Sequence, residues 1–429
     1  MKKISTAVRC ALATMACAVP FAAIATDGYF SHGYGMKGKG MAGATTAMAA
    51  DAFGGANNPA SMVWAGSRLD LGVDLFSPRR KVKREGSGGG GLDFSVDSDS
   101  TLFAIPEIGY NTMYSPNVSL GVSVYGNGGM NTDFEGGQLN CTSFGGPPSA
   151  NGLCGVGRLG VNLEQLIIAP TVAWKFAPNH SVGIAPLFGY QKFRLQGAHL
   201  FTQLSQAPGE VTNRDHDNAT GFGVRIGYMG RISPAVTVGA SYASKMRMGE
   251  FDKYKGLFAE NGGFDLPEHY TLGIALRPMD GWLVALDYKK IKYGSIASIA
   301  NPSTNQAPLG SSGGPGFGWQ DVDVFKVGVE YQASPALALR AGFGRTDNPI
   351  QSRDVSFNIL APGVVQDHYT LGFTYAIDNS SEITGAYMHA KRNAVTGFSF
   401  FNAFAPGMGG VETIEMYQNS LGIAWGKRW

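Results

Sequence analysis

Large apolar residues alternate with small or polar residues at a period of two along most of the chain beyond residue 68. The alternation is clear at residues 270–277 and 369–376, and residues 325–331 supply a further apolar face. Successive side chains of a strand point to opposite faces, so the pattern predicts strands with one greasy face and one small or polar face. Near the C-terminus the apolar positions are Tyr417, Leu421, Ile423, Trp425 and Trp429, and the intervening ones are Gln418, Ser420, Gly422, Ala424 and Gly426.

Turn signals between these segments are alternately short and long. Six short turns and seven longer loops predict fourteen antiparallel strands, although the sequence alone would also fit twelve or sixteen. In outer-membrane barrels the short turns face the periplasm, which predicts that both termini lie on that side. The short turns are at residues 115–117, 177–179, 233–235, 278–281, 334–336 and 378–381.

The composition favours a membrane barrel over a helical membrane protein. Beyond the first 25 residues there is no run of about 18 apolar residues, so no transmembrane helix is expected. The 61 glycines and the low share of charged residues, 15%, suit strands of which one face meets lipid. The predicted fold class is therefore an all-β membrane protein, a β-barrel.

The first 25 residues have the pattern of a secretory signal peptide. Lys2, Lys3 and Arg9 precede an apolar run, and Ala23-Ile24-Ala25 forms a cleavage site. The whole chain contains 34 basic and 32 acidic residues, and removal of the three basic residues of the signal leaves a balance of about −1. Nothing in this charge distribution indicates a nucleic-acid partner.

The segment at residues 28–62 is too rich in Gly and Ala to bury a core of its own, so another part of the chain must enclose it. We therefore predict three parts: a signal peptide at residues 1–25, an N-terminal hatch or plug at 26–67, and a transmembrane barrel at 68–429. Asn58-Pro59-Ala60 is predicted to form a tight turn at the centre of the plug.

The plug segment resembles the hatch of the FadL/TodX family of bacterial outer-membrane channels. The resemblance rests on a Ser-x-Gly-x-Gly lead at residues 31–35, on Asp51, and on an Asn-Pro-Ala-x-Met motif at 58–62. Residues 316–321, 339–350 and 368–372 also resemble family signatures. The resemblance implies a 14-stranded barrel with a hatch that imports long-chain fatty acids or other hydrophobic molecules. The hatch residues so implied are Asp51, Asn58, Pro59 and Ala60, and Tyr29 and Phe30 would reach the ligand pocket.

Two outer loops are candidates for a greasy capture groove, as the family resemblance implies. Their apolar residues are spaced to share one face of a short helix. The alternative is a small core that packs the loops together. The residues are Leu200, Phe201 and Leu204 in one loop and Tyr254, Leu257 and Phe258 in the other.

The glycines at residues 126–129 are candidates for a lateral opening. Residues 118–134 resemble the third strand of the family, which contains a kink, and consecutive glycines can interrupt a ladder. Gly126, Gly128 and Gly129 would then border a gap through which ligand leaves sideways into lipid. The alternative is a strand that ends at a glycine loop.

Four cationic residues lie on the small or polar face of predicted strands and could hold a carboxylate head group in the lumen. The alternative is that they pair with luminal acids and hold the plug. They are Arg225, Lys245, Arg277 and Arg340.

The remaining motifs indicate structure and not chemistry. Cys141 and Cys154 lie in one Gly/Pro-rich stretch of an exported chain, which favours a disulfide. The Gly-x-Gly-x-x-Gly matches at residues 33–43 follow no strand, and the seven histidines are scattered, so neither a cofactor nor a metal site is predicted.

We therefore interpret the chain as a monomeric channel for passive uptake of hydrophobic small molecules, with outer-membrane lipid as its surroundings and no enzymatic activity. A general porin is the alternative within the compartment, and the plug argues against it. An outer-membrane lipase is a more distant alternative, because no motif brings a serine and a histidine together.

Overall fold

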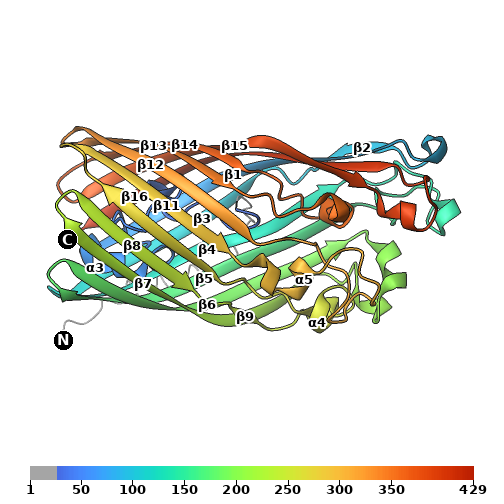
Figure 1. Ribbon diagram of the computed structural model, residues 1–429, viewed down its shortest axis with the longest axis horizontal. Coiled ribbons are helices and arrows are strands. Elements are labelled where there is room, and N and C mark those ends of the chain that lie inside the picture. Colours follow the sequence, from blue (N-terminus) through green and yellow to red (C-terminus); the bar gives the residue numbers. More distant parts are fainter. Residues whose placement is uncertain (1–26) are drawn as a thin grey trace.

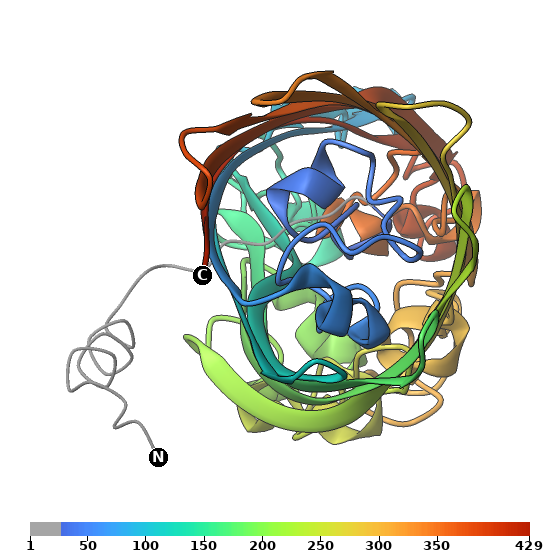
Figure 2. The same cartoon turned by 90° about the vertical axis from the view of Figure 1, so that its left-hand side faces the viewer.

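The computed structural model describes residues 27–429, so the predicted signal peptide lies outside the described residues. The strands form one antiparallel sheet that closes into a barrel through the pairing of β16 with β1 (Figures 1 and 2). Within residues 27–429 no helix combines the length and the apolar character needed to cross a membrane.

Fourteen of the sixteen strands between residues 27 and 429 form the barrel wall, which confirms the predicted fold class. The other two are short: β2 pairs with the far end of β1, and β9 pairs with β7. The strands are β1 (Arg68–Glu85), β2 (Phe94–Asp97), β3 (Phe103–Ser115), β4 (Val118–Phe134), β5 (Leu159–Ala177), β6 (His180–Gln196), β7 (Asp217–Ser233), β8 (Val236–Ala243), β9 (Arg247–Met248), β10 (His269–Leu276), β11 (Trp282–Ile291), β12 (Val322–Ser334), β13 (Leu337–Thr346), β14 (Asp367–Ala376), β15 (Ser381–Phe398) and β16 (Val411–Arg428).

The period-two pattern separates an outer apolar face from an inner face of small or polar residues. Leu371 and Leu421 are each 61% exposed on the outside, whereas their neighbours Thr370 and Ser420 are buried on the inside. The lumen-facing side chains are buried because the plug and the loops fill the barrel, and not because opposite sides of the barrel touch.

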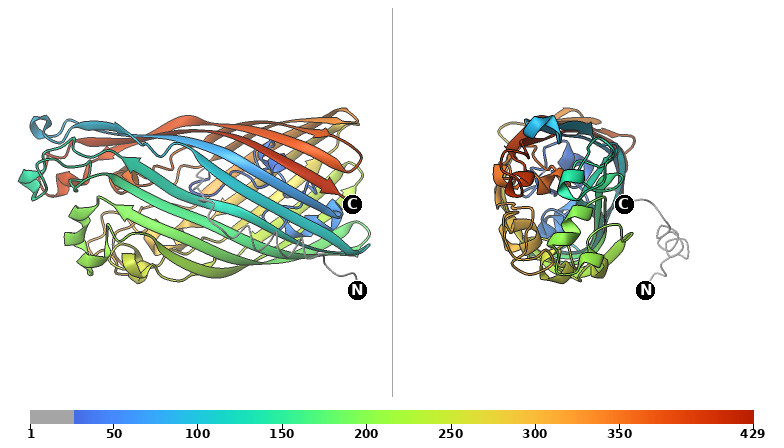
Figure 3. Two further views of the ribbon diagram at one scale, coloured as in Figure 1. Left: turned by 180° about the vertical axis from the view of Figure 1, so that it is seen from behind. Right: turned by 90° about the vertical axis from the view of Figure 1, so that its right-hand side faces the viewer.

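The two ends of the barrel differ in the length of their connections. The predicted short turns lie at the end that carries the C-terminus, and long loops with short helices cover the other end (Figures 1 and 3). The loop helices are η2 (Gly88–Gly90), η3 (Thr142–Phe144), η4 (His199–Leu204), η5 (Pro208–Glu210), η6 (Asp252–Tyr254), α4 (Ala259–Gly262), η7 (Tyr293–Ser295), α5 (Ala297–Ala300), η8 (Ser352–Asp354), η9 (Phe357–Ile359) and η10 (Phe400–Ala403).

This arrangement predicts which residues are reachable from outside the cell. Single cysteines placed within residues 198–218 should react with a membrane-impermeant maleimide on intact cells, and cysteines at residues 233–235 should react only after permeabilisation. Equal labelling of both positions on intact cells would contradict the orientation. The native Cys141 and Cys154 form a disulfide and supply no free thiol.

The N-terminal segment before β1 lies inside the barrel as a plug (Figure 2). It contains α2 (Met36–Lys39), η1 (Pro59–Ser61) and α3 (Met62–Ala65) and is otherwise irregular. Residues 27–67 are called the plug below.

Glycines on the inner face of the strands allow the plug to approach the wall closely. A Cβ added at Gly342 of β13 would lie 2.5 Å from the carbonyl carbon of Met41, and one at Gly109 of β3 would lie 2.8 Å from the carbonyl oxygen of Ala52. Real Cβ contacts are essentially never this short, so these positions exclude any side chain. The plug is thereby seated directly on the backbone of the wall. Glycines with similar plug contacts are Gly121, Gly183, Gly227, Gly239, Gly273, Gly328, Gly372 and Gly422.

Candidate functional site

The wall is interrupted between β3 and β4. The two strands pair from Ser115 and Val118 as far as Ile108 and Val124, after which β3 continues along β1 alone. Strand β4 runs on to Phe134, paired with β5. Among the described residues, no pairing with a β3 residue exists for β4 beyond Val124. We call this interruption, along residues 125–132 of β4, the window.

A β-bulge sits at the edge of the window. The register between β4 and β5 shifts between Gly126 and Gly128, which leaves Asn127 as an extra residue. A bulge of this kind bends a strand and leaves backbone groups free to bond elsewhere. The predicted glycines therefore border the interruption: Gly126 and Gly128 flank the bulge, and Gly129 follows it. Side chains fill the gap in this conformation, since a Cβ on Gly126 would lie 3.1 Å from Ile105 Cγ2.

The N-terminal arm, residues 27–31 of the plug, pairs with the free edge of β4. Ser31 donates its backbone N–H to the Asn127 carbonyl at 3.1 Å, and Gly129 donates to the Tyr29 carbonyl at 3.2 Å. Phe30 and Gly128 form the bridge between these two bonds. The arm thus satisfies the backbone groups that β3 leaves unpaired.

A buried ion-pair group holds the arm at its other end. Asp27 Oδ2 lies 3.0 Å from Lys326 Nζ and 3.6 Å from Lys289 Nζ, and all three side chains are buried. Tyr293 adds a hydrogen bond by accepting the backbone N–H of Tyr29 at 3.2 Å. Because both lysines project from wall strands, these contacts fasten the arm to the barrel.

Behind the window the two arm aromatics join an aromatic pocket. The Tyr29 ring lies 5.3 Å from the rings of both Phe30 and Tyr293, and 5.9 Å from Trp319. All four side chains are buried. Rings at such distances pack against one another, and Tyr29 and Trp319 line a cavity of 20 Å³.

The residues predicted to form a capture groove are packed together under the outer loops. Phe201 stacks on Phe357 at 5.0 Å, and both Tyr254 and Phe258 pack on Phe193. Phe201, Tyr254, Leu257 and Phe258 are buried, and Leu200 and Leu204 are half-buried. Burial raises the pKa of the Tyr254 phenol, which donates to the Asp215 carbonyl at 2.6 Å. The six residues belong to a loop core, and Phe201, Leu257 and Phe258 line a small cavity of 20 Å³.

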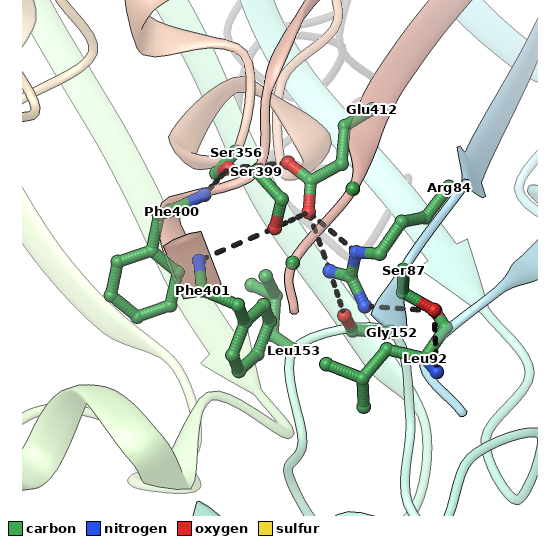
Figure 4. Close-up of polar contacts among 12 residues, drawn as sticks. Arg84, Ser87, Leu92, Gly152, Leu153, Ser356, Ser399, Phe400, Phe401 and Glu412 are labelled. Carbon is green, nitrogen blue, oxygen red and sulfur yellow. Dashed lines mark hydrogen bonds and ion pairs between the residues drawn. The ribbon is translucent and has the colours of Figure 1, made fainter. Parts of the chain in front are cut away.

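A second group of contacts ties several outer loops together (Figure 4). Arg84 Nε donates to Glu412 Oε1 at 2.9 Å, and both side chains are fully buried. Glu412 also accepts hydrogen bonds from Ser356 and Ser399, and Arg84 donates to the Gly152 carbonyl at 2.8 Å. The guanidinium lies 4.6 Å from the centre of the Phe401 ring. The sequence analysis does not predict this pair. The available signal is a charged residue near the end of each of two strands, Arg84 in β1 and Glu412 in β16, which are neighbours because they close the barrel.

The four predicted luminal cations occupy different environments. Arg225 donates to the Gly55 carbonyl of the plug at 2.7 Å, and Arg340 pairs with Glu330 at 2.6 Å. Lys245 lies 3.7 Å from Asp265 near the outer loops. Arg277 is exposed at the turn end, where it lines a cavity of 340 Å³ together with Arg340. The structure therefore does not bring the four together.

The predicted hatch residues lie at the centre of the plug. Asn58 Oδ1 accepts the Ala60 N–H at 3.1 Å, and Asn58 Nδ2 donates to the carbonyls of Thr46 and Tyr228. Pro59 begins η1 against Gly183 of β6. Asp51 accepts the Phe53 N–H at 3.0 Å and so closes a neighbouring turn. One buried side chain, Asn58, thus connects two plug segments to the wall.

Replacing Asn58 by alanine should loosen the plug and leave the barrel intact. The change removes a cap and two further hydrogen bonds, each worth about 1 kcal/mol. We expect faster hydrogen–deuterium exchange in residues 53–62 and altered uptake, with normal heat-modifiable migration. Asn117→Ala, in an exposed turn, is the control. A barrel that fails to fold would show that this segment is structural for the wall.

Comparison with known proteins decides the family. The family described as outer membrane protein transport protein (OMPP1/FadL/TodX) matches residues 13–399. The chain belongs to this family. It is therefore a bacterial outer-membrane β-barrel channel for hydrophobic compounds and not an enzyme, as its sequence predicts. A search of curated proteins found no match.

Solved structures of low sequence identity share the fold. The toluene transporter TodX of Pseudomonas putida has a TM-score of 0.68 and 17% identity, with 93% of this chain and 99% of that chain covered. A FadL homologue of Pseudomonas aeruginosa has a TM-score of 0.65 and 14% identity over the same shares. The toluene transporter TbuX of Ralstonia pickettii has a TM-score of 0.63 and 17% identity, again over 93% and 99%.

Proposed function

We propose that this channel takes up hydrophobic small molecules passively and releases them sideways through the window into the outer membrane. The observation that carries the proposal is the position of the aromatic pocket, directly behind the part of β4 that lacks a β3 partner. A ligand in the pocket is separated from lipid by the arm and by side chains, with no complete backbone ladder between them.

Energetics favour the lateral route over a route through the plug. An apolar ligand gains about 0.8 kcal/mol for each CH₂ group that stays out of water. The turn end of the lumen, in contrast, is lined by charged groups such as Lys37, Arg277 and Glu382. The plug also rests on wall glycines without intervening side chains, so a path through it would require the whole plug to move.

The apolar character of the pocket supports a hydrocarbon or a fatty acid as ligand. Solved relatives of the same fold include proteins named as toluene transporters and as a monoaromatic hydrocarbon channel. The alternative of a general porin would need a wet and open lumen, which the plug does not offer.

Uptake and conductance measurements separate these functions. Cells that make the channel should take up labelled toluene or dodecanoate faster than cells that lack it, with no change for a hydrophilic sugar. The purified protein in a planar bilayer should show no steady ion conductance. Sugar flux and ohmic conductance would instead establish a porin.

A further inference from the structure

Basic side chains gather on the outer surface of the barrel where β15, β16 and β1 adjoin, with blue β1 beside red β16 in Figure 3. Glu415 of β16 lies between the two strands that carry them, because it is opposite Lys81 and 2.6 Å from Arg392. Lys81 is half-buried, and the other members are exposed. We call this group the basic patch, and its members are Arg79, Lys81 and Lys83 of β1 and Lys391 and Arg392 of β15.

The basic patch begins just beyond the apolar outer face of the same strands. Leu75 of β1 lies opposite Leu421 of β16, and both side chains are exposed. Four residues farther toward the long loops, Arg79 lies opposite Tyr417. A strand rises about 3.3 Å per residue, so the wall changes from apolar to cationic within about 13 Å. Because the long loops of outer-membrane barrels face outward, the patch lies at the level of the head groups of the outer leaflet.

The acidic neighbours of the basic patch neutralise only part of its charge. Lys83 pairs with Glu85, and Arg392 pairs with Glu415, each at 2.6 Å. Within residues 27–429 no carboxylate forms an ion pair with the other three members, and Asp97 of β2, which lies across from β1, forms no ion pair either. The patch therefore carries surplus positive charge.

Cations at the same end of the β11–β14 side of the barrel are arranged differently. Lys290 of β11 lies 3.1 Å from Asp323 of β12, and Arg345 of β13 lies 3.1 Å from Asp367 of β14. These cations have an acidic partner on the neighbouring strand. The surplus at β15, β16 and β1 is thus not a general property of this end of the barrel.

The side chains of the basic patch suit phosphate groups. The Arg392 guanidinium lies 4.9 Å from the centre of the Tyr417 ring, and Arg79 stands beside the same tyrosine on the other neighbouring strand. A guanidinium binds phosphate through two parallel N–H···O bonds, and lysine adds a point charge. Clusters of Lys and Arg at a membrane surface bind anionic lipids in this way. The acyl chains of such a lipid would lie on the apolar face that includes Leu75 and Leu421.

We infer that the basic patch binds the two phosphates of lipid A, the glycolipid of the outer leaflet of the bacterial outer membrane. The cations of β1 extend over four residues, about 13 Å, which suits two phosphates at the ends of a disaccharide better than the single phosphate of a glycerophospholipid. The inference goes beyond the proposed function, because it concerns the outside of the barrel and no step of uptake depends on it.

Binding of two forms of lipid A tests the inference. Diphosphoryl lipid A and monophosphoryl lipid A share the disaccharide and the acyl chains but differ by one phosphate. Native mass spectrometry of the purified full-length channel in non-ionic detergent measures the Kd of each. We expect the diphosphoryl form to bind about tenfold more tightly, which corresponds to roughly 1.4 kcal/mol. Dioleoylphosphatidylglycerol should bind no more tightly than the monophosphoryl form.

Substitutions locate the preference on the barrel. Arg79→Gln combined with Lys81→Gln removes two charges and no ion pair, and it should abolish the preference. Arg79→Lys combined with Lys81→Arg keeps both charges and should retain most of it. Arg345→Gln, on the outer face of β13 at the same end, is the matched control and should change neither affinity. Heat-modifiable migration verifies folding, and Arg79→Gln alone, with a smaller expected loss, replaces the double variant if that variant fails to fold.

Each result bears on the basic patch separately from uptake. Equal binding of the two lipid A forms, or an unchanged preference in the folded glutamine variant, would overturn the inference. Tighter binding of phosphatidylglycerol than of diphosphoryl lipid A would also overturn it, because the patch would then recognise any anionic head group. None of these results alters the proposed uptake of hydrophobic molecules, which the transport and conductance measurements test.

Discussion

Replacing Gly128 and Gly129 together by valine is expected to reduce uptake by about tenfold or more, equivalent to at least roughly 1.4 kcal/mol of barrier. Two β-branched side chains favour a regular strand where the glycines permit an interruption. Ligand would then still bind in the lumen, but its lateral exit through the window would be closed. The measurement compares uptake of labelled ligand by cells with equilibrium binding to the purified variant, which should remain near normal.

A glycine outside the window provides the matched control for this variant. A Cβ added at Gly209, in an outer loop, would meet nothing within 4 Å, so Gly209→Val should leave both uptake and binding unchanged. If the folded double variant at residues 128 and 129 takes up ligand at the normal rate, the ligand leaves by another path.

Replacing Asp27 by asparagine is expected to release the N-terminal arm. The change leaves Lys326 and Lys289 buried side by side without their shared carboxylate, and breaking a buried pair in this way costs about 3–5 kcal/mol. The arm should therefore exchange its amide hydrogens faster over residues 27–35. Because the arm covers the free edge of β4, uptake of hydrophobic ligand should rise.

Hydrogen–deuterium exchange followed by mass spectrometry measures this release directly. Glu85→Gln removes a carboxylate from an exposed pair with Lys83 and should leave the arm unaffected. Unchanged protection of residues 27–35 in Asp27→Asn would mean that the hydrogen bonds to Asn127 and Gly129 suffice to hold the arm.

The barrel and its plug could be predicted because their causes are local in sequence. Strand faces follow from a period of two. The alternation of short turns and long loops leads to the fourteen strands of the wall, although the sequence alone also fits twelve or sixteen. The plug was recognisable because a segment of Gly and Ala cannot bury a core alone. The glycines of the wall that receive the plug were equally visible, but their purpose depends on contacts between residues far apart in the chain.

The details of the site depend on register and could not be predicted in the same way. An apolar loop residue such as Phe201 has the same sequence signature in an open groove and in a packed loop core. Arg80 and Arg84 likewise look equivalent on one face of β1. Only the pairing with β16 shows that one has Glu412 opposite and the other has Met416.

The pairing of the N-terminal arm with β4 is the main feature of the site that the sequence does not predict. Tyr29 and Phe30 were expected near the ligand, but nothing in residues 27–31 indicates that their backbone pairs with β4. That pairing depends on free backbone groups at the window, which exist because β3 turns away to follow β1. The absence of a β3 partner for this part of β4 therefore explains why the arm, residues 27–31, pairs there.

A reversible covalent staple across the window tests the lateral route most directly. A Cβ on Gly126 would lie 3.1 Å from Ile105 Cγ2, so cysteines at positions 105 and 126 are close enough to be bridged. In the same cells, uptake should fall when the pair is oxidised and recover when it is reduced, whereas the two single-cysteine variants should not respond. Undiminished uptake through the fully oxidised channel would contradict passage through the wall.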